Sequence, residues 1–194
     1  MKAIMNIFVI LGIAAVLVFA YKLFDQARTE QQSLVQAEAY LFKTKEDFMA
    51  MKKSKAESIA NFAAEHHEPF AILEIPKLEK SLPIVEGVEA DDLKKGIGHI
   101  SNTAYPGQGE QIVISGHRDT VFRGIGALEI GDHFVVDMPY DTYTYEIRET
   151  EIVPEDDTTV IRSMGEEVLV VTTCYPFNYV GNAPYRFIYY AYPL

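Results

Sequence analysis

The sequence predicts a mainly β domain that follows an N-terminal transmembrane helix and a helical stalk. Three observations lead to this fold class. An apolar run opens the chain, a stretch without Pro or Gly continues to residue 68, and short apolar or alternating runs between turn residues fill the rest. We therefore divide the chain into a membrane segment (1–24), a stalk (25–68) and a β domain (69–194).

Residues 4–24 form the apolar run, which only Asn6 and Lys22 interrupt. About 20 apolar residues are enough for a helix to cross a bilayer, so we expect an uncleaved signal-anchor. The tripeptide at residues 18–20 is similar to a weak signal-peptidase site, which leaves cleavage as the alternative. Lys22 lies near the end of the run and Arg28 follows it, so charge alone does not decide the orientation of the helix.

The stalk is predicted to be helical from Asp25 to about His67. It carries a weak apolar stripe with a seven-residue spacing, made of Leu34, Leu41, Phe48 and Phe62. Lys55 interrupts this series. The pattern favours a stalk that lifts the domain off the membrane. The alternatives are a helix that packs back onto the domain and a coiled coil.

Pro69 ends the helical pattern and opens the β domain. The predicted strands are 70–75, 82–85, 112–115, 133–138, 142–148, 150–153, 168–173 and 185–192. Short helices are predicted at 90–95 and 158–163, and a loop at 104–110 with its Pro and two Gly residues. Several short strands at this spacing are typical of a closed barrel or a sandwich.

The net charge of −11 is concentrated in the β domain. Of the 17 Lys/Arg and 28 Asp/Glu residues in the chain, 9 and 20 lie from Pro69 onward. An acidic domain without a basic stripe argues against nucleic acid as a partner. It also argues against docking of the domain itself to an anionic lipid surface.

Cys174 is the only cysteine in the chain. A single thiol excludes an internal disulfide, a four-thiolate zinc site and a C-x-x-C redox pair. Free thiols are scarce in exported proteins, so Cys174 is either a buried small hydrophobe or a functional group. The histidines and scattered carboxylates show no metal-ligand spacing, and no metal or cofactor is expected.

Three segments place reactive side chains at predicted strand ends. One apolar strand ends in Gly116 and His117, a second ends in Cys174, and Arg186 interrupts an aromatic third. An imidazole can take the proton of a thiol, and the thiolate is the nucleophile. A guanidinium is always charged and can donate two hydrogen bonds to an oxyanion. Cys174, His117 and Arg186 are therefore a sufficient set for acyl transfer.

Other residues near these segments have weaker indications. Ser115 and Thr173 flank the proposed pocket and are candidates for lining it. Asp119 either orients the His117 loop or caps a turn. Each main residue also has a plain structural explanation, since His117 could be an ordinary loop histidine and Arg186 could pair with a carboxylate. No role is evident for the histidines at 66 and 67, and those at 99 and 133 are expected to be structural.

These segments resemble those of the sortases, the cysteine transpeptidases of Gram-positive bacteria. Sortases carry a T-L-x-T-C motif at a strand end, and residues 170–174 read V-V-T-T-C, so the last two positions match and the first two depart. The family histidine matches His117, in the context G-H-R-D-T, and the family arginine matches Arg186. The C-Y-P-F sequence, the short interval from Cys174 to Arg186 and the N-terminal anchor are most similar to class D.

The resemblance implies a closed eight-stranded β-barrel with short helices, held at the membrane by a single-pass helix with the domain outside the cytoplasm. It implies that Cys174 attacks an L-P-x-T-x sorting signal after Thr and forms a thioester. His117 would act as acid and base, and Arg186 would hold the oxyanion. The acceptor would be an amine of a peptidoglycan precursor or stem peptide, and the product a surface protein joined to the cell wall.

Three alternatives remain beside this interpretation. A non-catalytic membrane-anchored peptide-binding module would leave Cys174 unreactive. A papain-like hydrolase would need a helix that carries the cysteine. A calcium site, as in some class A relatives, would draw on residues 155–157 with Glu89, Asp91 and Asp92, but these show no recognisable oxygen-ligand loop.

Overall fold

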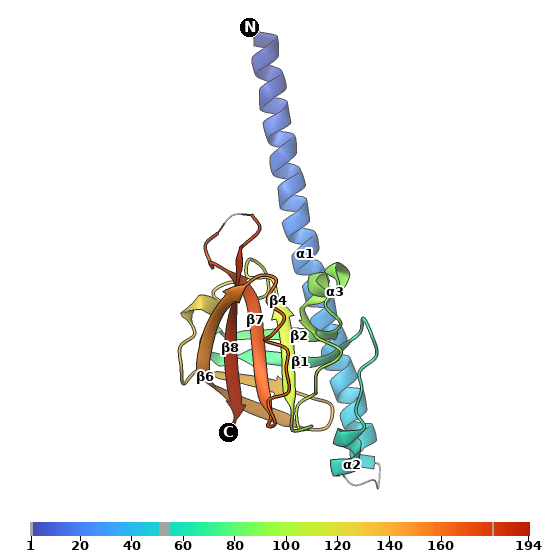
Figure 1. Ribbon diagram of the computed structural model, residues 1–194. Helices are drawn as coiled ribbons and strands as arrows, with labels where there is room; N and C mark the ends of the chain where they lie inside the picture. The colour runs from blue at the N-terminus through green and yellow to red at the C-terminus, as the bar shows by residue number, and fades with distance from the viewer. Residues whose placement is uncertain (1, 51–54, 180) are drawn as a thin grey trace.

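The structure is a computed structural model that describes residues 2–50, 55–179 and 181–194, with a long N-terminal helix beside a closed barrel (Figure 1). The strands are β1 (Pro69–Ile75), β2 (Lys80–Glu86), β3 (Ile97–His99), β4 (Gln111–Gly116), β5 (His133–Asp137), β6 (Thr142–Pro154), β7 (Val168–Tyr175) and β8 (Tyr185–Pro193). Their order is β1-β2-β3-β4-β7-β8-β6-β5, closed by pairing of β5 with β1. The β2–β3 and β4–β7 pairs are parallel and the others antiparallel. The predicted closed barrel is confirmed, and a sandwich is excluded.

Two strand predictions are wrong in detail. The segments 142–148 and 150–153 form one strand, β6, whose register shifts between Ile147 and Glu149. A bulge of this kind bends a strand without ending it, and β8 pairs along both halves. The strand β3 was not predicted, because three residues carry too little pattern to be recognised. It forms only where β2 and β4 supply its backbone partners.

The strand β7 is apolar on both faces because both faces are covered. Leu169 and Val171 belong to the core inside the barrel, whereas Val168 and Val170 belong to a second cluster. That second cluster is covered by partly buried side chains that include Met164. β-Branched residues suit such a doubly packed strand. The result is a rigid strand whose last residues reach the rim of the barrel.

The N-terminal helix α1 (Lys2–Ala50) packs along the barrel instead of standing free of it. Ala37 and Leu41 are buried against Ile72 of β1. Lys45 Nζ lies 2.8 Å from Asp137 Oδ1 at the end of β5. The segment therefore packs back onto the domain, which was one of the alternatives, and its role in lifting the domain off the membrane stays a prediction.

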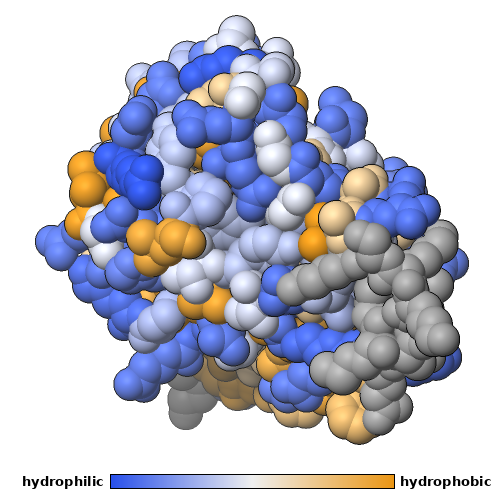
Figure 2. All heavy atoms as spheres, turned by 90° about the horizontal axis from the view of Figure 1, so that it is seen from below, coloured by the Kyte–Doolittle hydropathy of each residue, from blue (hydrophilic) through white to orange (hydrophobic). Residues whose placement is uncertain are grey.

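The first half of α1 projects beyond the barrel (Figure 1). Its described apolar side chains before Asp25 are exposed, and this is the one helix in the described chain long and apolar enough to cross a membrane. Helix α1 already contacts the domain at Gln26, whose Nε2 donates to Lys94 O at 3.2 Å. The β7–β8 connection lies at the end of the barrel from which α1 projects. The opposite end is mostly hydrophilic, with apolar groups scattered in small clusters (Figure 2).

The prediction that the helical segment continues to about His67 is wrong for its last residues. After α2 (Lys55–Ala60), residues 61–68 are irregular. His67 N–H donates to Glu86 O at 2.8 Å, and Glu86 N–H donates to Glu68 O at 3.0 Å. The backbone of this segment therefore pairs with β2 instead of with itself. In the predicted stalk stripe, the side chain of Phe48 lies outside the described residues.

The helix predicted at 90–95 is confirmed as α3 (Ala90–Lys95), and residues 104–110 form the predicted loop. Glu89 begins α3 with a capping box, in which its side chain and that of Asp92 each accept a backbone N–H. Two 3₁₀ turns, η1 (Pro76–Leu78) and η2 (Ile125–Ala127), were not predicted. Residues 158–163 form turns, so the helix predicted there is wrong.

Candidate active site

Cys174 is the seventh residue of β7 and is partly exposed. In the antiparallel register of β7 and β8 it lies directly opposite Arg186. Directly opposite residues in such a pair point to the same side of the sheet. The sheet alone therefore brings the thiol and the guanidinium to one face at one rim.

His117 reaches the same rim from the other side of Cys174. The parallel register of β4 and β7 pairs Gly116 with Thr173, so the next residue of each strand is His117 and Cys174. The Thr173 hydroxyl donates to Gly116 O at 2.8 Å and ties the two strand ends together. A side chain at Gly116 would bring its Cβ to 2.7 Å from the Phe122 ring, so only glycine fits at this position.

The three predicted residues open onto one cavity of about 340 Å³. Its lining consists of His117, Arg118, Asp119, Glu155, Cys174, Gly181, Asn182, Ala183 and Arg186. Because Cys174 lies on a strand and not on a helix, the papain-like alternative is excluded. Ser115 and Thr173 are absent from the described lining, and Thr173 is buried with its hydroxyl directed at backbone.

Arg186 is fixed by three groups around it. Its Nη1 donates to Ala183 O at 3.2 Å and to Tyr185 O at 3.1 Å, and its Nη2 lies 3.6 Å from Glu155 Oε2. These contacts hold the guanidinium at the cavity while about a third of the side chain stays exposed. From the sequence, Glu155 was considered only for a calcium site, at residues 155–157. Its proximity to Arg186 arises because β6 and β8 are neighbours.

Arg118 is a site residue that the sequence did not reveal. Its guanidinium donates to the carbonyls of Pro176, Tyr179 and Gly181, and it also lies over the Tyr179 ring. These partners are 58 to 63 residues away in the chain. Arg118 thus joins the turn that carries His117 to the loop that follows β7, and only the fold could show it.

The His117 turn is supported from within the domain. Phe122 N–H donates to His117 O at 3.0 Å, and Lys80 Nζ donates to Val121 O at 2.7 Å. Burial lowers the pKa of Lys80. Asp119 is exposed and lines the cavity, but none of the described hydrogen bonds joins it to His117.

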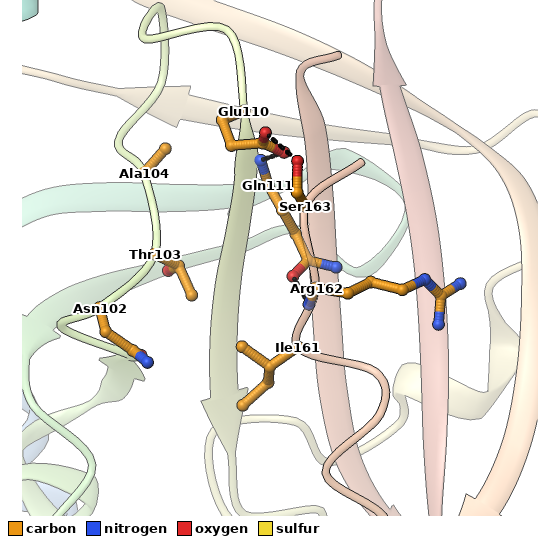
Figure 3. Close-up of a pocket in the computed structure, with 8 residues that line it drawn as sticks. All are labelled: Asn102, Thr103, Ala104, Glu110, Gln111, Ile161, Arg162 and Ser163. Atoms are coloured by element: carbon orange, nitrogen blue, oxygen red, sulfur yellow. Dashed lines mark hydrogen bonds between the residues drawn. The ribbon is translucent and has the colours of Figure 1, made fainter. Parts of the chain in front are cut away.

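A second pocket, of about 300 Å³, lies between the segments 102–104 and 161–163 and holds none of the predicted catalytic residues (Figure 3). Glu110 lines this pocket and accepts hydrogen bonds from Ser163 Oγ at 2.7 Å and from Met164 N–H at 2.7 Å. Hydrogen bonds from Ser163, Met164 and Gln111 lower the pKa of Glu110 to about 2. Arg162 N–H also donates to Gln111 Oε1. These two side chains accept the N–H groups of Arg162 and Met164, which explains why this segment is not helical.

A family model described as a sortase domain matches residues 73–194. The chain is 46% identical to Sortase D of Bacillus subtilis (strain 168), with 98% of each chain covered. A Clostridium perfringens Sortase D5 transpeptidase superposes with a TM-score of 0.66 at 28% identity, covering 82% of this chain and 99% of that one. The catalytic domain of B. anthracis SrtD gives a TM-score of 0.58 at 42% identity, covering 70% and 96%.

Proposed function

The chain belongs to the sortase family of cysteine transpeptidases, and from this premise we propose that Cys174, His117 and Arg186 carry its reaction. The observation that supports this most is the strand order β4-β7-β8. It sets the thiol between the imidazole and the guanidinium at one cavity. The substrate is a surface protein with an L-P-x-T-x sorting signal, and the acceptor is an amine of a peptidoglycan precursor or stem peptide.

The first half of the reaction forms an acyl-enzyme. The Cys174 thiolate attacks the Thr carbonyl carbon, and the carbonyl electron pair moves to oxygen. Arg186 donates hydrogen bonds to that oxyanion. As the tetrahedral intermediate collapses, the peptide C–N bond breaks and His117 gives a proton to the leaving amine. The Thr carbonyl is then held as a thioester on Cys174.

The second half transfers the acyl group. His117 removes a proton from the incoming ammonium or amine, whose nitrogen attacks the thioester carbonyl. Collapse of the second tetrahedral intermediate breaks the C–S bond and releases Cys174 as a thiolate. The product carries a new amide bond between Thr and the acceptor. No cofactor takes part in either half.

The position of the cavity fits an acceptor at a membrane. The β7–β8 loop, which contributes Gly181 and Asn182 to the lining, lies at the end of the barrel from which α1 projects (Figure 1). Helix α1 is packed on the barrel, so this end is held toward the bilayer if α1 is an uncleaved single-pass anchor. We place the domain outside the cytoplasm, where lipid-linked precursors and exported proteins meet.

An acyl-enzyme experiment tests this function. The full-length protein in detergent micelles is incubated with a library of L-P-x-T-x peptides, and its mass is measured before and after addition of an amine. We expect a mass increase on Cys174 that the amine removes, with the peptide product extended by that amine. Cys174→Ala should show neither change. Turnover retained by Cys174→Ala would exclude Cys174 as the nucleophile.

A further inference from the structure

Two consecutive histidines, His66 and His67, lie in the segment that joins α2 to β1. Their ring centroids are 3.9 Å apart, with 36° between the ring planes. In an extended chain consecutive side chains point to opposite sides. Here His67 has a φ of 68°, in the left-handed region that residues other than glycine rarely adopt. Such a conformation persists only where the surroundings impose it.

The surroundings that impose this turn belong to β2 and α3. His67 N–H donates to Glu86 O at 2.8 Å, and Lys95 Nζ donates to His67 O at 2.6 Å. Gly87 leaves the space in which the His66 ring lies, because a Cβ there would be 3.0 Å from His66 Cε1. The two imidazoles are therefore held side by side by contacts from β2, from Gly87 after it and from α3.

Glu89, at the start of α3, completes a group of three potential metal ligands. One ligand atom each from His66, His67 and Glu89 all lie within 4.8 Å of one another, and all three side chains are exposed. The sequence did not indicate this group because β1 and β2 separate the histidines from Glu89 in the chain. No regular ligand spacing exists until the fold brings the two segments together.

One buried carboxylate orients two of these three residues. Asp92 is 1% exposed, and its Oδ1 lies 2.9 Å from His67 Nδ1. Its Oδ2 accepts from Glu89 N–H at 3.0 Å. When Nδ1 of His67 donates to Asp92, the lone pair of Nε2 is free to bind a metal. A carboxylate behind a ligating histidine is the usual way in which metal sites fix the ring and raise its basicity.

We propose that His66, His67 and Glu89 form a Zn²⁺ site, with Asp92 as the positioning residue behind His67. Two imidazole nitrogens and one carboxylate oxygen are a common protein ligand set for zinc, and water takes the fourth position because the group is open to solvent. The bound ion would join the chain before β1 to the start of α3. Since α3 also packs against α1, the ion would strengthen the link between the anchor helix and the barrel. None of the three ligands lines the cavity with Cys174.

Metal titration of the full-length protein in detergent micelles tests this site. A Cys174→Ala background removes the only thiol that could bind the metal elsewhere. Zn²⁺ binding is measured by calorimetry, and Co²⁺ binding by the visible absorption of the tetrahedral ion. We expect one ion per chain, and a loss of affinity of at least about tenfold in His66→Ala, His67→Asn and Glu89→Gln. His133→Ala, on β5, is the matched histidine control and should bind as the parent does.

The substitutions are chosen to keep the fold. Asn tolerates the left-handed conformation of residue 67, and Gln keeps a side-chain oxygen for the helix cap at residue 89. Zn²⁺ should raise the Tm of the parent more than that of Glu89→Gln at the same Zn²⁺ concentration, because stabilisation by a ligand grows with its affinity for the folded state. Asp92→Asn should weaken binding by about tenfold through the orientation of His67. Absence of Zn²⁺ binding by the parent, or equal affinity in the parent and the Glu89→Gln variant, would overturn the proposal.

Discussion

Two histidines at the ends of neighbouring strands have opposite surroundings. His99, the last residue of β3, is 1% exposed, and its ring is bonded to Glu86 Oε2 at 2.7 Å, Ala104 O at 3.0 Å and Thr103 Oγ1 at 3.1 Å. His117 follows β4, the antiparallel partner of β3, and is exposed at the rim. The His99 ring has a hydrogen-bond partner at both nitrogens, while His117 faces a cavity.

The buried histidine belongs to a closed network. Tyr105 OH also donates to Glu86 Oε2, at 3.1 Å, and burial raises the pKa of Tyr105 to about 12. Burial opposes the ionisation of Glu86, but the hydrogen bonds from His99 and its other neighbours lower its pKa overall. One residue type therefore serves stability where its hydrogen bonds are complete, and can serve chemistry where they are left open.

The largest expected effect is on catalysis at the open site. His117→Ala should lower the rate of peptide cleavage by about 10²- to 10⁴-fold, because His117 is the only imidazole among the described residues that line the cavity with Cys174. Its midpoint of urea unfolding should stay close to that of the parent, since the side chain is exposed. A near-normal rate would remove His117 from the reaction and end the contrast with His99.

A substitution in the closed network around His99 should lower stability and leave turnover largely unchanged. His99→Ala leaves the buried Glu86 carboxylate without its imidazole partner, so we expect the free energy of unfolding to fall by about 3 kcal/mol. The measurement is urea unfolding followed by circular dichroism, with His133→Ala, a partly buried histidine on β5, as the control. Under conditions where His99→Ala is folded, its turnover should stay within a few-fold of the parent. A catalytic loss as large as that of His117→Ala would contradict the division between the two histidines.

Arg186→Lys tests whether the open site needs the geometry of the guanidinium or only its charge. Lysine keeps the charge but loses the planar fork that reaches Ala183 O and Tyr185 O while facing the cavity. We expect kcat/KM for the sorting peptide to fall by about 10²-fold, most of it in kcat, because an oxyanion forms only in the reaction. Steady-state kinetics with a single L-P-x-T-x peptide separate the two constants. A loss confined to KM would assign Arg186 to substrate binding instead.

The smallest effect concerns Glu110, which binds the 162–164 turn. Its pKa is lowered from 4.5 to about 2 in the folded state, so its stabilisation is present above the unfolded value and is lost as the pH falls from about 4.5 to about 2. Glu110→Gln should therefore lower the Tm by a few degrees at pH 7, and the difference should shrink across that interval. A difference that stays constant from pH 7 to pH 2 would show that ionisation of Glu110 is not its cause.

Much of the fold could be predicted from the sequence, and the errors have local causes. The strand that carries Cys174 was recognisable because β-branched residues run without interruption up to it. β6 was split at its bulge, and β3 was missed because its formation depends on the strands beside it. The helix predicted at 158–163 failed because the Gln111 side chain binds the backbone of Val160 and Arg162, and Glu110 binds the Ser163 hydroxyl.

The sequence by itself determined the chemistry that is available. It supplied one thiol at a strand end, a histidine after a glycine, an arginine in the next strand and an apolar N-terminal helix. The tertiary structure decided which groups meet: Arg118 with the loop after β7, Glu155 with Arg186, α1 with β1, and Glu89 with the two adjacent histidines. The difference arises from the distance along the chain over which each effect acts. Periodicity and turn chemistry act over a few residues, whereas these contacts depend on strand pairing and helix packing, which bring together segments that are far apart in the chain.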